Sequence, residues 1–189
     1  MSASPTHHFT HLECSMTGQA VTNDQARNLS PEGWPLLARY DLEAIKATAD
    51  RDEIAARNPV CFPGFWKWRE LLPVADDAHV TSLGEMDTPL VETQATAAKI
   101  GLKGPLLVKE EGRLPTGSFK ARGLALAVSM ARSYGVNRMA MPTNGNAGAA
   151  LSAYGARAGM ETWCFCPEDT PEVNVREIAA QGGHVYRVN

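Results

Sequence analysis

One lysine stands out as a residue that could do chemistry. Lys120 lies in the segment PTGSFKARG (residues 115–123), directly after a Gly-Ser turn and just before the apolar helical run LALAV at 124–128. Poor solvation and the positive end of a helix dipole both disfavour the ammonium form of a lysine in such a position. Because the neutral amine is a nucleophile toward aldehydes, the sequence predicts a Schiff-base lysine at position 120.

The nearest competing motif is a phosphate-binding P-loop. Gly112 and Gly117 have its G-x4-G spacing. A P-loop needs Lys and then Ser or Thr directly after the second glycine. Here Ser118 and Phe119 follow Gly117, so Lys120 comes too late and the P-loop is excluded. Taken alone, Lys120 could still be a surface lysine at a helix start.

A second polar turn follows a strand-like segment. Residues 139–148 read MAMPTNGNAG, and helix-forming residues continue to Ala158. A turn of Thr143, Asn144 and Gly145 at a helix start offers backbone N–H groups and a favourable dipole end to a carboxylate or a phosphate. Taken alone, this turn is equally typical of an ordinary helix N-cap, for which Thr and Asn are common choices.

In this order, the two motifs resemble the fold-type II pyridoxal-phosphate enzymes, and among them the threonine synthases most closely. Three further segments are similar to that family: WKWRELLP at 66–73, TSLGEMDTPL at 81–90 and PEDTP at 167–171. The resemblance covers residues 36–189 and implies an α/β fold of the tryptophan synthase beta type, with a parallel sheet of βαβ units. It implies pyridoxal 5'-phosphate as the cofactor.

The resemblance also implies roles for individual residues. Lys120 would bind the cofactor aldehyde and then act as the catalytic base, and Ser118 and Phe119 would shape the turn that aims it. Asn146 would hydrogen-bond the phenolic oxygen of the cofactor. The substrate carboxylate would be received at the helix start by Thr143, Asn144, Gly145 and Ala147. For Glu110 and Arg122, an ion pair that supports the loop and a catalytic role both remain open.

The reaction implied by the resemblance is the conversion of O-phosphohomoserine and water to threonine and phosphate. It implies a cytoplasmic lyase of threonine biosynthesis that acts on a small amino acid and is a homodimer at full length. Ala121 departs from many relatives, which have Asp directly after the lysine, and this weakens the choice of substrate. Two alternatives stay open: another fold-type II lyase, of the serine/threonine dehydratase or diaminopropionate ammonia-lyase type, and a non-catalytic half-fold that serves as a binding module.

The chain is short for this resemblance. Its 189 residues suit one ordinary domain, about half the length of the family. It lacks a glycine-rich tetrapeptide for the cofactor phosphate and a late Ser or Thr to face the pyridine nitrogen. We therefore expect the N-terminal portion of a longer enzyme, inactive alone. Three parts are expected: a degenerate ribbon-like extension (1–40), part of a large cofactor-binding domain with the lysine loop (41–135), and part of a small, truncated βαβαβ domain (136–189).

The hydrophobic pattern predicts the elements that position these residues. We expect an amphipathic helix at 41–56 and a buried strand at 106–109. Beyond them, the pattern predicts helices at about 118–134, 146–158 and 171–181, and strands at about 138–142, 161–166 and 184–188. Because strands alternate with helices of this length, right-handed βαβ units and a parallel sheet are expected.

Composition and charge exclude several functions. Hydrophobic residues make up 44% and charged residues 21% of the chain, as in ordinary globular proteins. A net charge of −3 gives no electrostatic footprint for nucleic acid or an anionic membrane. No apolar run is long enough to span a bilayer. Residues 1–8 lack the basic and apolar regions of a secretion signal.

The cysteines and histidines predict neither disulfides nor a metal site. Cys164 and Cys166 are two apart on an expected strand, so they should share one face as free thiols, as in a reducing compartment. The remaining cysteines are Cys14 and Cys61. His7, His8, His11 and Cys14 have spacings that zinc could use. However, Thr17 stands where the second cysteine of a zinc ribbon would be, so no metal is expected.

Overall fold

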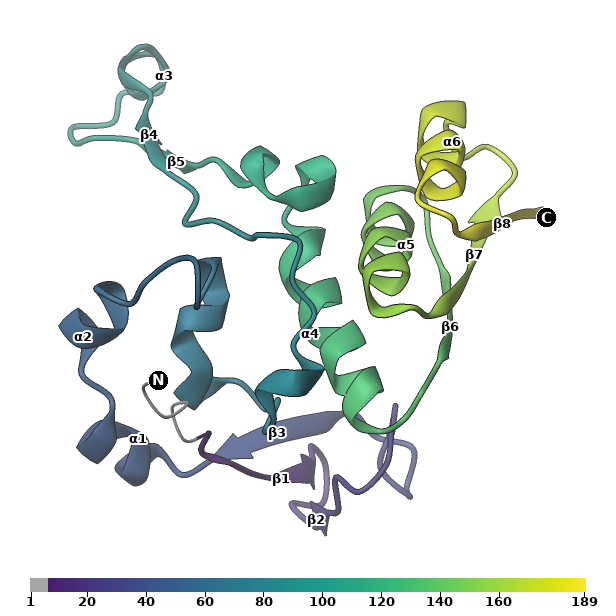
Figure 1. The fold of residues 1–189 in the computed structure, drawn as a ribbon. Coiled ribbons are helices and arrows are strands. Elements are labelled where there is room, and N and C mark those ends of the chain that lie inside the picture. Colours follow the sequence, from purple (N-terminus) through teal and green to yellow (C-terminus); the bar gives the residue numbers. More distant parts are fainter. Residues whose placement is uncertain (1–6) are drawn as a thin grey trace.

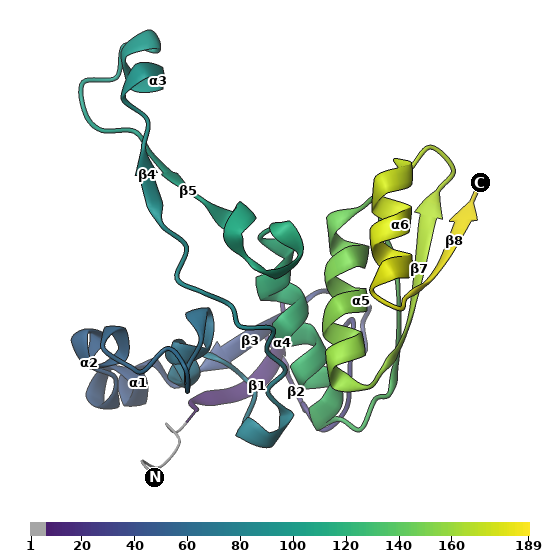
Figure 2. The same ribbon diagram turned by 45° about the horizontal axis from the view of Figure 1, so that its top comes forward.

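The computed structural model describes residues 7–189, and the start of the segment examined for a secretion signal lies outside them. Helix α4 (Lys120–Ser133) runs through the middle of the molecule (Figure 1). An N-terminal antiparallel sheet lies on one side of it and a C-terminal βαβαβ unit on the other. A narrow arm projects away from both, as the turned view in Figure 2 shows. None of the described helices is long and apolar enough to cross a membrane.

The N-terminal sheet has three antiparallel strands in the order β2-β1-β3. They are β1 (Phe9–Cys14), β2 (Ala20–Val21) and β3 (Leu36–Tyr40). Cys14, the last residue of β1, is fully buried. Within residues 7–189 there is no group of three or more His, Cys, Asp or Glu side chains placed to hold a metal ion.

The prediction of a single helix at 41–56 is wrong, because the chain forms two short helices there. They are α1 (Leu42–Thr48) and α2 (Arg51–Ala55). Ala49 is extended, and the Asp50 carboxylate accepts hydrogen bonds from the backbone N–H groups of Asp52 and Glu53 at 2.8 and 2.9 Å. Asp50 thus caps a new helix, and a capping side chain competes with continuation of the preceding one.

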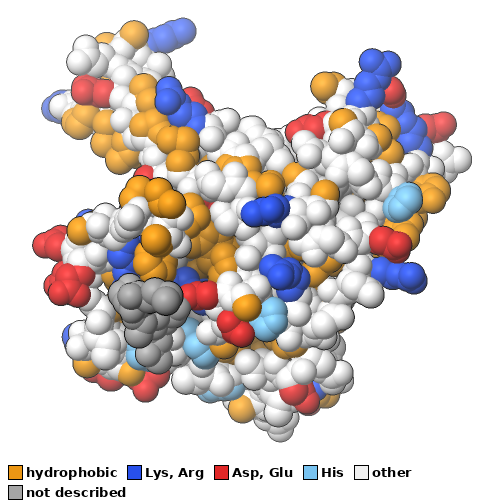
Figure 3. All heavy atoms as spheres, in the orientation of Figure 1, with side chains coloured by type: hydrophobic (Ala, Val, Ile, Leu, Met, Phe, Trp, Pro, Cys, Tyr) orange, Lys and Arg blue, Asp and Glu red, His pale blue; other side chains and the backbone are white. Residues whose placement is uncertain are grey.

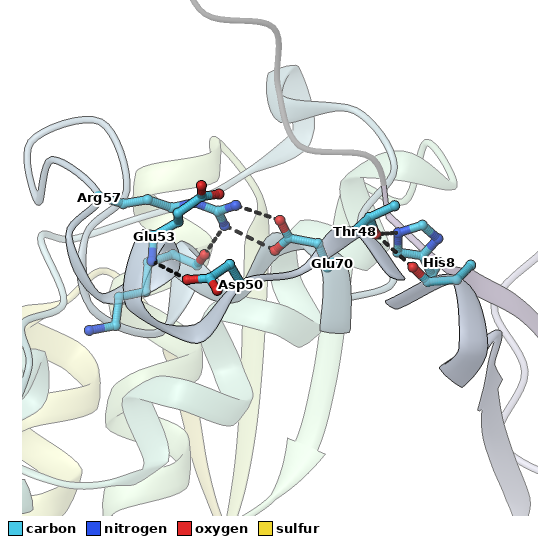
Figure 4. Close-up of polar contacts among 8 residues, drawn as sticks. His8, Thr48, Asp50, Glu53, Arg57 and Glu70 are labelled. Carbon is cyan, nitrogen blue, oxygen red and sulfur yellow. Dashed lines mark hydrogen bonds and ion pairs between the residues drawn. The ribbon is translucent and has the colours of Figure 1, made fainter. Parts of the chain in front are cut away.

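A partly buried ion pair joins Arg57, just after α2, to the following segment. Arg57 donates two hydrogen bonds to the Glu70 carboxylate and a third to the carbonyl of Lys67 (Figure 4). Glu70 is nearly fully buried, and its pKa is lowered by the Arg57 guanidinium against the opposing effect of burial. The segments between α2 and α4 include short 3-10 helices at Gly64–Leu71, Asp77–His79, Glu111–Arg113 and Pro115–Gly117.

The arm is a two-stranded antiparallel hairpin that carries one short helix. Its elements are β4 (Leu90–Glu92), α3 (Gln94–Lys99) and β5 (Leu107–Lys109). The strand expected here exists, but the expectation that it is buried is wrong: Leu107 is 50% and Val108 45% exposed. Hydrophobic side chains gather on the surface of this arm (Figure 3). A two-stranded hairpin has no second layer of its own, and no other described element covers its faces.

The C-terminal unit confirms the expected parallel sheet, in the order β6-β7-β8. Helices α5 and α6 lie together on one face of it (Figure 2). The expected helices and strands here are confirmed to within about two residues. The elements are β6 (Arg138–Pro142), α5 (Asn146–Ala158), β7 (Glu161–Pro167), α6 (Glu172–Ala180) and β8 (His184–Val188).

The core lies where α4, α5 and β7 meet. Leu151, Tyr154 and Ile178 are 0–1% exposed, and small residues such as Ala125 and Ala149 let α4 and α5 approach closely. As expected, Cys164 and Cys166 share the helix-covered face of β7 and are free thiols. Burial raises the pKa of both thiols.

Candidate active site

An open pocket of about 560 Å³ lies where the start of α4 meets the start of α5. It brings together Lys120 and all five residues expected in the asparagine loop and at its helix start, from Thr143 to Ala147. Ser118 and Phe119 do not line the pocket; they lie in the turn behind Lys120. A cavity of similar size beside residues 59–66 contains none of these groups.

The lysine turn uses backbone conformations that side chains rarely adopt. Thr116 has φ +62°, and among the described residues no other residue with a side chain has a positive φ. Gly117 follows it at φ +64°. A left-handed Thr costs about 1–2 kcal/mol, so the surrounding structure must hold it in place. The turn delivers Lys120 as the first residue of α4. There its ammonium lies 4.7 Å from the ring centroid of Phe119, a cation–π contact.

Two hydroxyl groups in this turn are buried and unsatisfied. Ser118 is 7% exposed, and its Oγ has no hydrogen-bond partner among the described residues; the Oγ1 of Thr116 is in the same state. Buried hydroxyls are nearly always hydrogen-bonded, and an orphan costs about 1–3 kcal/mol. Both orphan hydroxyls lie in the turn that leads into Lys120.

An ion pair joins the lysine helix to the base of the arm. Arg122 binds Glu111 through two hydrogen bonds of 2.7 and 2.8 Å, and the Thr88 hydroxyl donates to the same carboxylate at 2.5 Å. The Arg122 guanidinium and the Thr88 hydroxyl hold the pKa of Glu111 at about 2, against some opposing desolvation. Of the two roles left open for Arg122, the structure shows an ion pair, with Glu111 as the partner.

The acidic partner of Arg122 differs from the residue singled out in the sequence. Glu110 does not pair with Arg122; its Oε1 accepts a hydrogen bond from the Gly112 N–H at 3.0 Å. Glu111 begins a short 3-10 helix and Glu110 is its N-cap residue, so the Glu110 side chain caps the helix while Glu111 is left to pair with Arg122. The sequence could not separate them, because both directly follow the same strand.

The asparagine loop is held from within by Thr143. Its Oγ1 accepts hydrogen bonds from the N–H groups of Gly145 at 3.1 Å and Gly148 at 2.9 Å. The N-cap residue of α5 is Gly145, which has no side chain, and Thr143, two residues earlier, satisfies the Gly148 N–H in its place. The N–H groups of Asn146 and Ala147, at the first two helical positions, have no acceptor within the helix. Free N–H groups at a helix start, together with the helix dipole, can bind an anion.

Asn174 is a pocket residue that the sequence did not single out. It lies in the first turn of α6, lines the pocket, and donates from Nδ2 to the carbonyl oxygen of Asn144 at 3.2 Å. The available signal was topological: β6 and β7 are parallel, so the segments after their carboxyl ends meet at one edge of the sheet. That rule places the segment after Pro167 beside the asparagine loop.

Comparisons with known proteins bear on this geometry. Residues 81–189, more than half of the chain, match the family model described as pyridoxal-phosphate dependent enzyme. The chain is 38% identical over 155 residues to the threonine synthase of Methanocaldococcus jannaschii and 35% identical over 158 residues to that of Methanosarcina acetivorans. These matches cover 82% and 83% of this chain, but in each case 37% of the relative.

Solved structures support the fold. The apo form of Escherichia coli diaminopropionate ammonia lyase matches with a TM-score of 0.52 at 19% identity, covering 62% of this chain and 39% of the other. The fold-type II architecture expected from the resemblance is confirmed, as is pyridoxal 5'-phosphate as the cofactor of the family. The chain spans a little over a third of the length of the curated relatives it matches.

Proposed function

Since this chain belongs to the pyridoxal-phosphate dependent enzyme family, we propose that it supplies the lysine and carboxylate-binding part of a threonine synthase. The whole enzyme would be a lyase that converts O-phosphohomoserine and water to threonine and phosphate. One observation carries the proposal: Lys120 and the asparagine loop, 23 or more residues apart in the sequence, line one pocket. The two archaeal relatives named threonine synthase support the choice of reaction.

The residues present fit the cofactor. Lys120 is a half-buried amine that lines an open pocket. In the preceding turn the ring of Phe119 is 58% exposed, and the buried hydroxyl of Ser118 has no hydrogen-bond partner among the described residues. Lys120 would hold the aldehyde, and Asn146 would orient the ring through its phenolic oxygen. When bound, the cofactor supplies an electron sink for negative charge that develops at the substrate α-carbon.

Side chains and backbone groups of this chain would bind the substrate and transfer its protons. The helix start would hold the substrate carboxylate through the N–H groups of Asn146 and Ala147. The amine of Lys120 would remove protons from Cα and Cβ while the bond from Cγ to the phosphate oxygen breaks. Water then adds its oxygen to Cβ, and protons return to Cγ and Cα. The ion pair of Arg122 with Glu111 would keep the lysine turn in place.

The proposal is tested by trapping the cofactor on the enzyme isolated from its own source. Borohydride reduction followed by peptide mass spectrometry should place the pyridoxyl group on Lys120. Lys120→Ala should abolish both the label and phosphate release from O-phosphohomoserine, a loss of at least about 10³-fold. Lys99→Ala, a lysine on the arm, is the matched control and should change neither.

Each alternative has its own outcome. Ammonia release from serine, threonine or diaminopropionate without phosphate release from O-phosphohomoserine would show a different lyase of the same fold. Absence of any label on Lys120, together with cellular function unchanged by Lys120→Ala, would show a non-catalytic binding module.

A further inference from the structure

We propose that Asn174 is a positioning residue, which locks the peptide group between Asn144 and Gly145 so that the loop presents N–H groups to an incoming carboxylate. The proposal rests on the proposed function for the identity of that carboxylate, an amino-acid substrate. The lock itself is a property of the protein without any ligand.

The peptide group between Asn144 and Gly145 is held at both polar ends. Its N–H donates to the Oγ1 of Thr143 at 3.1 Å, and its carbonyl oxygen accepts from the Nδ2 of Asn174 at 3.2 Å. The two side chains come from different elements, the end of β6 and the first turn of α6. The peptide plane therefore cannot rotate without breaking two hydrogen bonds at once.

Such a lock is needed because the loop is otherwise free to turn. Gly145 has φ +155° and ψ −110°, a region that residues with a side chain rarely adopt. A glycine rotates between such regions at little cost, so the peptide before it flips readily unless it is held. A flip would turn the carbonyl oxygen of Asn144 from α6 toward the pocket, where it would repel a carboxylate.

The asparagine side chain also fits the glycine sterically. A Cβ built at Gly145 would lie 2.6 Å from Nδ2 and 3.0 Å from Cγ of Asn174. The amide of Asn174 thus occupies the space that a side chain at Gly145 would need. An amide is also suited chemically, since it donates a hydrogen bond to the carbonyl without charge, whereas the isosteric carboxylate of Asp only accepts.

The lock leaves the N–H groups at the start of α5 available to a carboxylate. With the Asn144 carbonyl bonded to Asn174 on α6, the N–H groups of Asn146 and Ala147, two residues that line the pocket, are left without an acceptor in the helix. Asn174 is half-buried and lines the same pocket. Its place on α6 makes the geometry of the carboxylate site depend on how α6 packs against α5.

Hydrogen exchange in the cofactor-free enzyme tests the lock directly. In Asn174→Ala the Gly145 N–H should exchange about 10-fold faster than in the parent, because the peptide can rotate away from Thr143. Val173→Ala, a 70% exposed neighbour on the same turn, is the matched control and should leave that rate unchanged. Exchange of the Leu151 N–H in the core of α5 verifies that each variant is folded.

Kinetics of the cofactor-loaded enzyme test the consequence. Asn174→Ala should raise KM for the amino-acid substrate about 5- to 10-fold, with kcat and cofactor affinity changed less than about 2-fold. Asn174→Asp should raise KM more, about 100-fold, because it loses the donor and places a negative charge near the carboxylate.

Two results would overturn the inference: Gly145 exchange in Asn174→Ala equal to that in Val173→Ala, or a KM for Asn174→Asp equal to that of the parent. Failure of the proposed function is distinguishable from either. It would be seen as an unlabelled Lys120 in the parent protein, while the exchange measurement still decides on the lock.

Discussion

The C-terminal unit and the arm both contain strands with apolar residues, but these strands lie in different environments. Strand β7 and strand β5 are both apolar segments of high strand propensity. Cys164 and Cys166 on β7 are fully buried under two helices, whereas Leu107 and Val108 on β5 are about half exposed. The difference teaches that an apolar pattern determines a strand, but burial requires a second layer to pack on it.

The comparison is sharpened most by making the same substitution in both regions. Leu151→Ala in α5, at 1% exposure, should lower the free energy of unfolding by about 2–5 kcal/mol, because it leaves a cavity in the core. Leu107→Ala in the arm, at 50% exposure, should lower it by less than about 1 kcal/mol. Urea denaturation of both variants measures the difference. Equal costs would show that the arm is packed as tightly as the core.

A glycine pair tests packing with a smaller change. At Gly148 in α5, an added Cβ would lie 2.5 Å from the Thr143 Cγ2 and 2.8 Å from the Ile178 Cδ1. Gly148→Ala should therefore destabilise the protein by about 1–3 kcal/mol through overpacking. At Gly104 in the arm nothing lies within 4 Å, and Gly104→Ala should be neutral or stabilise by up to about 1 kcal/mol. Thermal unfolding of both variants and the parent measures these changes in stability. A Gly148→Ala variant as stable as the parent would contradict the close packing around Gly148.

The smallest effect concerns the ion pair of Glu111 with Arg122, which joins the base of the arm to α4. The pKa of Glu111 is lowered from its usual 4.5 to about 2, so its ionised form stabilises the folded state above pH 4.5. That contribution is lost as the pH falls from about 4.5 to about 2. Glu111→Gln should cost about 1–2 kcal/mol at pH 7, since both partners are partly exposed.

Urea unfolding at a series of pH values measures this link. The difference between the parent and Glu111→Gln should shrink through that acid range and vanish below it. Glu110→Gln is the neighbouring control: its amide oxygen can still accept from the Gly112 N–H, so its effect should be small. A difference between the parent and Glu111→Gln that does not depend on pH would contradict the role of the ion pair.

Local sequence was sufficient for the elements of the C-terminal half. Helix α5 was expected at 146–158 and is found there, because its Thr-Asn-Gly start and Gly159 end are strong local signals; Gly159 is left-handed at φ +69°. The helix expected at 41–56 failed for a local reason as well, since Asp50 caps a second helix. The prediction that residues 106–109 are buried was wrong for a non-local reason, because no second layer packs on this strand.

The site divides in the same way. The sequence alone determined which residue types could do chemistry: a lysine after a Gly-Ser turn, and a Thr-Asn-Gly turn that opens a helix. Side-chain chemistry and helix-end electrostatics are local, so they are legible in a short segment. Only the tertiary structure decided that these turns share one pocket, that Arg122 pairs with Glu111, and that Asn174 holds the loop. Some of these contacts join residues that are far apart in the chain. Others involve one of two neighbouring residues of the same type, such as Glu110 and Glu111, and only the packing in three dimensions determines which of the two makes the contact.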